Sequence, residues 1–162
     1  MCLGLDQWDS QDGAGWTVLH RASAFGQGSD IEKLLNLRAN SKLITYTLKW
    51  LPISCAVAFG NESTFATLVG LIQPQHLRKL KDSRGWTLLH IAAENGSEAM
   101  ITRLLLLKFD PFAKSNKSTI CVPKGLPFEE FTPGEIAKFC NNHVAYDRAM
   151  KNTGHPIMSS AN

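Results

Sequence analysis

The sequence predicts an all-α solenoid of about four helix–turn–helix repeats, each preceded by a short hairpin-like finger. The segment G-W-T-V-L-H-R-A at residues 15–22 returns almost unchanged as G-W-T-L-L-H-I-A at residues 85–92. Between them, W-L-P-I-S-C-A at residues 50–56 stands in the same register, so that the three tryptophans are 34 and 36 residues apart. Periods of this size are typical of stacked repeats, in which each unit buries its apolar face only against its neighbours.

The first helix of each repeat has recognisable start and stop signals. Thr17 and Thr87 stand where a helix cap would accept a hydrogen bond from the opening amides, and Pro52 stands at a first helical position. A glycine follows at the same distance in all three segments, namely Gly26, Gly60 and Gly96. We expect each glycine to end its helix with a positive φ, because that conformation is favourable mainly for glycine.

The second helices are predicted from apolar residues at helical spacing. They follow at Ile31 through Leu35, at Phe65 through Ile72 and at Met100 through Leu107. Their apolar positions would face the adjacent repeat.

A fourth repeat has weaker signals of the same kind. Thr132, Pro133 and Glu135 form a predicted capping box with proline in the first turn. Asn141 stands where the other repeats have glycine, and asparagine is the next most tolerant residue in that conformation. The last helix is expected from about His143 to Lys151.

These signals divide the chain into repeats at about residues 12–45, 46–81, 82–113 and 128–151. Residues 114–127 would be an insertion, either on the binding face or as a tolerated surface loop. Residues 1–11 form an N-terminal extension and residues 152–162 a frayed tail. The extension could cap the first repeat through Leu3, Leu5 and Trp8, or the chain could be a piece of a longer array.

The repeated segments resemble the ankyrin-repeat family. Its T-P-L-H-x-A pattern is similar to T-V-L-H-R-A, L-P-I-S-C-A, T-L-L-H-I-A and T-P-G-E-I-A, which begin at residues 17, 51, 87 and 132. Residues 12–15 and 82–85 both read D-x-x-G, as in the finger turn of that family. The resemblance implies a curved all-α solenoid that binds other proteins, has no catalytic residues and uses no cofactor, metal or small-molecule substrate.

The two histidines of the repeated segment have a structural and a chemical interpretation. In ankyrin-like repeats the position of His20 and His90 bridges the finger and the next helix, and we favour this role. A metal or catalytic site would need Cys, Asp or Glu at ligand spacing, and none is present. The alternative of an enzyme that uses Cys121 as a nucleophile lacks a histidine placed to activate it. The chain is therefore predicted not to be an enzyme.

Aromatic residues recur at one position of every repeat, directly before the helix cap. They are Trp16, Trp50, Trp86 and Phe131, and Phe25 and Phe59 precede the turn glycines. Large aromatic side chains on a concave surface are typical of binding hot spots, so we expect these six to contact a partner protein. The alternative is a hydrophobic staple, in which the aromatic residue packs on the fourth residue of its helix. Those residues are Arg21, Cys55, Ile91 and Ile136.

Charge gives a weaker indication of the partner. Arg78, Lys79, Lys81 and Arg84 cluster before the third repeat, where they could steer an acidic segment of the partner protein, or could be ordinary solvated surface. The formal net charge of +3 is too small to indicate nucleic-acid binding. Scattered cysteines, no signal peptide and no apolar run of membrane-spanning length favour an intracellular protein, cytoplasmic or nuclear. The alternative function is a structural arm of a larger multidomain protein.

Overall fold

The computed structural model describes residues 7–117, 123–127 and 129–157. These residues form nine α-helices and no strand, which confirms the predicted all-α class. The chain divides into two compact units, and the division falls between Ser83 and Arg84. Leu3, Leu5, Cys121 and the end of the predicted tail lie outside the described residues.

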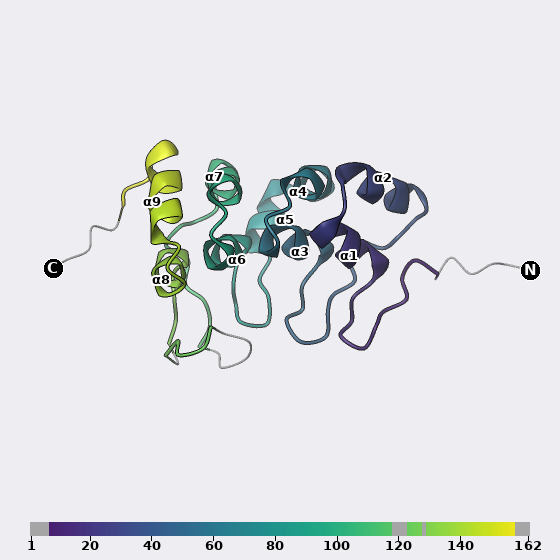
Figure 1. Cartoon of the computed structure of the whole chain (residues 1–162), viewed down its shortest axis with the longest axis horizontal. Helices are drawn as coiled ribbons and strands as arrows, with labels where there is room; N and C mark the ends of the chain where they lie inside the picture. Colours follow the sequence, from purple (N-terminus) through teal and green to yellow (C-terminus); the bar gives the residue numbers. More distant parts are fainter. Residues whose placement is uncertain (1–6, 118–122, 128, 158–162) are drawn as a thin grey trace, which may run out of the picture. The chain divides into compact units, whose positions relative to one another are not determined.

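Unit 1 contains two helix pairs and one short additional helix. The first pair is α1 (Val18–Phe25) and α2 (Gly28–Asn36), and the second is α3 (Pro52–Ala58) and α4 (Glu62–Val69). In Figure 1, α1 lies beside α3 and α2 beside α4. Leu19, Ile31, Ile53, Phe65 and Leu68 fill the space between the pairs and are at most 2% exposed. Their burial supplies the main favourable free energy of this unit.

Unit 2 repeats this arrangement with α6 (Leu88–Asn95), α7 (Glu98–Leu106), α8 (Pro133–Phe139) and α9 (His143–Asn152). Here α6 packs on α8, and α7 packs on α9. Its core includes Leu89, Ile101, Leu104, Ile136 and Ala149, all fully buried. The predicted range of the last helix, about His143 to Lys151, agrees with α9 except that α9 ends one residue later.

The helix caps formed as the sequence predicted. Thr17, Thr87 and Thr132 each cap a first helix in a capping box with the residue three positions later. Pro52 begins α3. These signals act within one helical turn, so they do not depend on the rest of the fold.

The helix ends agree with the prediction except at Gly26. Gly60, Gly96 and Asn141 have positive φ angles of 65°, 81° and 61°. Gly26 instead has φ −91° and ψ −166°, so the expected left-handed conformation is wrong there. Its extended backbone leads directly to Gln27, whose N–H donates to Asp30 Oδ2 at 2.9 Å. The chain thus enters α2 without a left-handed residue.

Helix α5 (Pro74–Lys79) was not predicted, and α4 ends at Val69 rather than at Ile72. Pro74 occupies the first turn of α5, and Leu77 is its buried residue. Arg78 and Lys79 therefore lie on a helix that precedes the third finger. Six residues are too few to display helical periodicity.

The fingers are joined by backbone hydrogen bonds. In unit 1, Tyr46 N–H donates to Ala14 O and Ser83 N–H donates to Leu48 O, both at 3.0 Å. In unit 2, Asn116 N–H donates to Arg84 O at 3.0 Å, so the start of the predicted insertion continues the finger. Beyond α9, His155 N–H donates to Met150 O at 2.9 Å. The predicted tail is thus held to α9 as far as it is described.

Candidate aromatic binding surface

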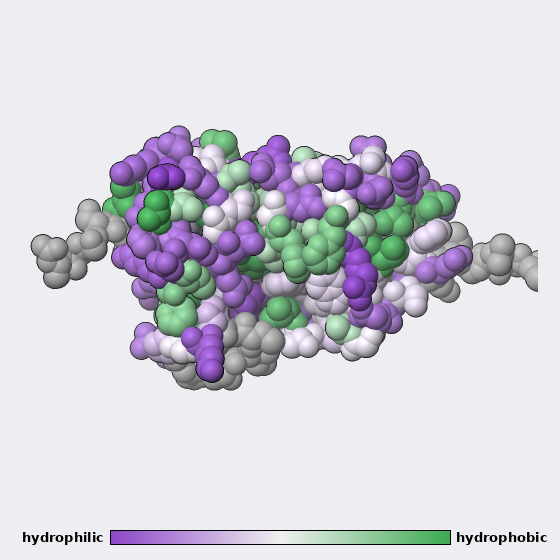
Figure 2. Space-filling view, viewed as in Figure 1, coloured by the Kyte–Doolittle hydropathy of each residue, from purple (hydrophilic) through white to green (hydrophobic). Residues whose placement is uncertain are grey.

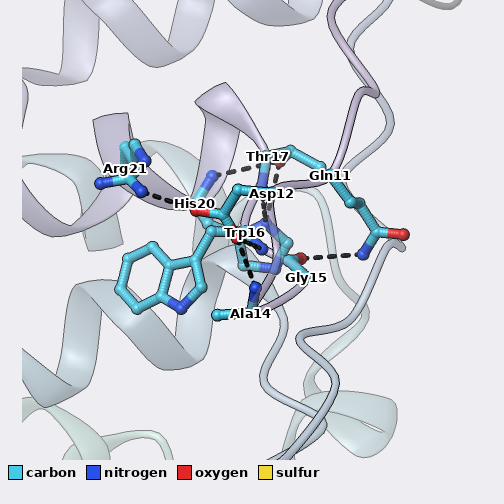
Figure 3. A network of polar contacts seen from close by, with 8 residues as sticks. All are labelled: Gln11, Asp12, Ala14, Gly15, Trp16, Thr17, His20 and Arg21. Atoms are coloured by element: carbon cyan, nitrogen blue, oxygen red, sulfur yellow. Dashed lines mark hydrogen bonds and ion pairs between the residues drawn. The ribbon is translucent and has the colours of Figure 1, made fainter.

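The finger before α1 is fixed by one aspartate. Asp12 Oδ1 accepts hydrogen bonds from the N–H groups of Ala14 and Trp16, both at 2.9 Å, and Oδ2 accepts one from Arg21 at 2.6 Å (Figure 3). These bonds, the backbone ones first, lower the pKa of Asp12, which keeps its carboxylate ionised. The finger therefore fixes the backbone at Trp16, and the indole projects away from this network (Figure 3).

His20 joins this finger to the next one, as predicted. Thr17 N–H donates to His20 Nδ1 at 3.2 Å, so that nitrogen carries no proton. The proton is therefore on Nε2, which lies 3.0 Å from the carbonyl oxygen of Trp50 and donates to it. His90 makes the equivalent contacts in unit 2, with Thr87 at 3.2 Å and with the carbonyl oxygen of Phe131 at 2.9 Å. Both histidines are fully buried and have structural roles.

Because His20 is buried, we expect the folded protein to become less stable as the pH falls. Burial lowers the pKa of His20 below its ordinary value of 6.5. Between the lowered pKa of the folded chain and 6.5, the unfolded chain binds a proton that the folded chain does not, so the free energy of unfolding decreases as the pH falls through this window. The contribution of this one group cannot exceed about 1.4 kcal/mol per pH unit.

Urea denaturation at pH 7.5, 6.5 and 5.5 measures this slope. His20→Asn should be less stable at pH 7.5 but should lose part of the pH dependence. An equal slope in the variant and the wild type would contradict the assigned protonation state.

Three of the predicted aromatic residues come together in unit 1, and we name them the aromatic cluster: Trp16, Phe25 and Phe59. The rings of Phe25 and Phe59 meet edge to face with centroids 4.7 Å apart, and those of Trp16 and Phe59 do so at 6.2 Å. Phe25 is 67% exposed and Phe59 46% exposed. Hydrophobic residues gather over α1 and α3 in Figure 2. An exposed group of large apolar side chains is typical of an interaction site.

Arg21 adds a charge beside the cluster. Its guanidinium carbon lies 5.9 Å from the centroid of the Trp16 ring, as the staple alternative required. The same guanidinium is paired with Asp12, and the side chains of Arg21 and Asp12 are 62% and 36% exposed. Such an exposed pair adds little stability, so Arg21 remains able to contact a partner.

Trp50 is positioned differently from Trp16. It is half-buried, and its indole Nε1–H donates to Asp82 Oδ2 at 3.1 Å. Its backbone carbonyl accepts the bond from His20 Nε2. Trp50 therefore links successive fingers.

Trp86 and Arg84 are not at the surface, where the predicted partner contacts require them. Each is only 1% exposed. The Arg84 guanidinium carbon lies 3.6 Å from the centroid of the Trp86 ring, and Arg84 Nη1 is 3.6 Å from Glu94 Oε2. The Trp86 ring also stacks on His90 with centroids 6.0 Å apart. These two side chains pack together inside unit 2, so they do not offer a contact surface or a steering charge.

The remaining predicted residues are accessible to different extents. Phe131 is half-buried, and its backbone bonds to Ser115 and His90. Arg78 and Lys79 on α5, and Lys81 after it, are exposed. These three basic side chains are therefore accessible to a partner protein, as the predicted electrostatic steering requires.

Tyr46 was missed by sequence reasoning. It is 51% exposed, and its ring lies so close to Gly15 that a Cβ built there would be 2.7 Å from Tyr46 Cδ1. The backbone bond from Tyr46 to Ala14 brings it to the first finger. No motif marks this tyrosine, because the contact depends on the pairing of two fingers.

The structure offers no assembled site for metal chemistry in the residues it describes. No group of three or more His, Cys, Asp or Glu side chains there is arranged to hold a metal ion. Cys55 is fully buried, and burial raises the pKa of its thiol to about 12. None of the helices in these ranges has the length and hydropathy needed to cross a membrane.

Comparison with known proteins identifies one segment. The family model described as Ankyrin repeat matches residues 84–116. This segment contains α6, α7 and the strongest sequence motif, T-L-L-H-I-A. The predicted resemblance is thereby confirmed. No curated protein matches the sequence.

Proposed function

Because residues 84–116 are an ankyrin repeat, we propose that the chain is a non-catalytic protein-interaction module of four such repeats. The equivalent helix pairs α1–α2, α3–α4 and α8–α9 support this count, with a capping box at the start of α1 and of α8 and a first-turn proline in α3. Ankyrin repeats generally bind proteins, and the exposed ring pair of Phe25 and Phe59 is the observation that carries the proposal.

The aromatic cluster is the proposed contact. Phe25 and Phe59 are both exposed, and each can bury a large apolar area against a partner side chain. The Trp16 ring contacts Phe59 edge to face, and the backbone N–H of Trp16 is bonded to Asp12. A rigid aromatic group loses little conformational entropy on binding, which favours its use as an anchor.

Exposed basic residues would complement an acidic partner segment. Arg21 lies beside Trp16, and Arg78, Lys79 and Lys81 are exposed in the same unit. Basic charge on the surface raises the rate of encounter with an acidic partner more than it raises affinity. The buried residues Trp86 and Arg84 have no part in this contact.

The test is a comparison of binding between variants that remain folded. Proximity labelling of the intact protein in its own cell identifies a partner, and titration calorimetry then gives its affinity. Phe25→Ala combined with Phe59→Ala should weaken binding at least about 30-fold, which corresponds to about 2 kcal/mol. Unchanged affinity with an unchanged circular dichroism spectrum would reject the cluster as the contact.

Leu106→Ala provides the matched control. Leu106 is 62% exposed on α7 in unit 2 and is not part of the cluster. Its replacement removes exposed apolar surface without touching the proposed contact, so affinity should stay within about twofold of the wild type.

A further inference from the structure

Helix α4 ends differently from the second helices of the first and third repeats. After α2 and α7 the chain turns back through one left-handed residue, Arg38 at φ 65° and Lys108 at φ 64°. After α4, neither Leu71 nor Ile72 has a positive φ. The β-branched side chain of Ile72 makes the left-handed conformation unfavourable. The chain therefore continues past α4 instead of turning back, and it forms α5 from Pro74 onward.

This departure from the repeat leaves a groove beside α5, which we name the α5 groove. It has a volume of about 350 Å³ and is lined by residues before, on and after α5 and by residues 41, 42 and 51. Leu71 is 53% exposed there. The other aliphatic residues of the lining are half-buried: Leu51, Ile72 and Leu80. Four aliphatic side chains thus meet solvent in one concavity.

The walls of the groove are held in place by contacts within unit 1. Leu77 of α5 is 1% exposed, and its burial holds the helix against the unit. The turn at Ser41 and Lys42 is fixed because Lys42 N–H donates to Asn40 Oδ1 at 2.9 Å. Asn40 N–H donates in turn to Asp9 Oδ1 at 2.8 Å. A groove that is formed before its ligand arrives binds at a lower entropic cost.

The polar lining of the α5 groove is basic. Lys42 and His76 line it beside two uncharged polar residues, and no aspartate or glutamate is among the described residues of the lining. No carboxylate in the described part of the chain forms an ion pair with Lys42. Residues 70–81 contain no acidic residue. Three further cations stand on α5 or directly after it, namely Arg78, Lys79 and Lys81.

The size and shape of the groove favour a peptide segment over a cofactor or a membrane surface. Ligand pockets typically measure about 300–1,000 Å³, so a groove of about 350 Å³ has room for one or two side chains. A membrane surface is bound by apolar side chains that project into it. Here three of the four aliphatic side chains are half-buried inside a concavity.

We propose that the α5 groove binds an acidic segment of the partner protein through an aliphatic side chain and a neighbouring carboxylate. The aliphatic side chain packs between Leu51 and Leu71. The carboxylate pairs with Lys42 and accepts a hydrogen bond from a ring N–H of His76. This contact rests on the proposed function in that the partner is a protein, but no residue of the aromatic cluster lines the α5 groove.

Titration of the isotope-labelled chain with a capped peptide of alternating glutamate and leucine residues tests the proposal by NMR. The amide shifts should concentrate at Lys42 and at residues 71–80. A peptide with glutamine in place of glutamate should bind at least about tenfold more weakly, because it cannot pair with Lys42. Equal affinity of the two peptides, or shifts confined to other parts of the chain, would overturn the proposal.

Charge reversal in the groove provides the decisive variant. Lys42→Glu with Leu71→Glu changes two exposed positions, so the chain should stay folded, and the glutamate peptide should bind at least about 30-fold more weakly. Lys33→Glu with Leu37→Glu is the matched control, because both residues are exposed and the change in net charge is the same. Its affinity should stay within about twofold of the wild type, since distant charges are screened by salt. An equal loss in both variants would overturn the proposal.

A milder variant keeps the test decisive if the double change unfolds the chain. Lys42→Gln retains the whole aliphatic lining and alters one exposed side chain. It should weaken binding of the glutamate peptide at least about threefold and leave binding of the glutamine peptide unchanged. Unchanged binding of the glutamate peptide would contradict the role of Lys42.

Two further measurements separate this site from the aromatic cluster and from a membrane. Phe25→Ala with Phe59→Ala should bind the glutamate peptide like the wild type, whether or not that variant still binds the partner protein. Loss of the peptide in this variant would overturn the assignment to the α5 groove, whereas retention of the partner would reject only the cluster. Vesicles of phosphatidylserine and phosphatidylcholine should not bind. Vesicle binding that Lys42→Glu with Leu71→Glu abolishes would assign the groove to a membrane surface and overturn the proposal.

Discussion

Replacing Trp86 with alanine is expected to lower the free energy of unfolding by about 3–5 kcal/mol. The indole is 1% exposed and lies between the Arg84 guanidinium and the His90 ring. Its removal leaves a cavity and takes away the aromatic face on which a buried cation rests. Urea denaturation followed by circular dichroism measures the loss, since the change itself alters tryptophan fluorescence.

Phe25→Ala is the matched control for this prediction. Phe25 is 67% exposed, and its ring contact with Phe59 is worth about 0.5–1.5 kcal/mol at most. A loss of stability as small for Trp86→Ala as for Phe25→Ala would contradict the packing of Trp86. Reduced binding by Trp86→Ala should therefore be interpreted as loss of folded protein.

Trp16 is half-buried whereas Trp86 is fully buried, and the repeat motif does not predict this difference. Both precede a cap threonine, and the sequence predicted one role for both. The residue two positions earlier differs: Arg84 reaches over the Trp86 ring, whereas Ala14 is too short to cover Trp16. Exposure at this position depends on a neighbouring side chain that the repeat motif does not include.

Local signals were predicted more completely than contacts between repeats. Thr17 and Thr132 act on amides within one turn, so the motif alone determines the cap. Burial of His20 was likewise implied by its place in the repeat. The approach of Tyr46 to Gly15 depends instead on how two fingers pair, which no spacing in the sequence encodes.

Replacing Gly96 with alanine is expected to cost about 2–4 kcal/mol of stability. Gly96 has φ +81°, a conformation that strains any residue with a Cβ by about 1–3 kcal/mol. A Cβ built there would also lie 2.6 Å from Asn142 Cγ, so the Asn142 side chain would have to move. That movement threatens its bonds to Ala93 and Glu94, each worth about 0.5–1.5 kcal/mol.

Gly70→Ala is the control, because Gly70 has φ −65° and its Cβ would meet nothing closer than Thr67 O at 3.8 Å. It should stabilise the chain by about 0.4–1 kcal/mol by restricting the unfolded state. Chemical denaturation of both variants separates conformational strain from a general effect of the added methyl group. Equal stabilities of the two variants would contradict the left-handed conformation at Gly96.

A double-mutant cycle then separates the two causes at Gly96. If the methyl group acts partly by displacing Asn142, then Gly96→Ala should cost less in a chain that already carries Asn142→Ala. The remaining cost measures the backbone strain alone, since alanine at 142 has no carboxamide to displace. Strict additivity would instead assign the whole effect to the backbone. In that case Asn142 could accommodate the methyl group without losing its bonds to α6.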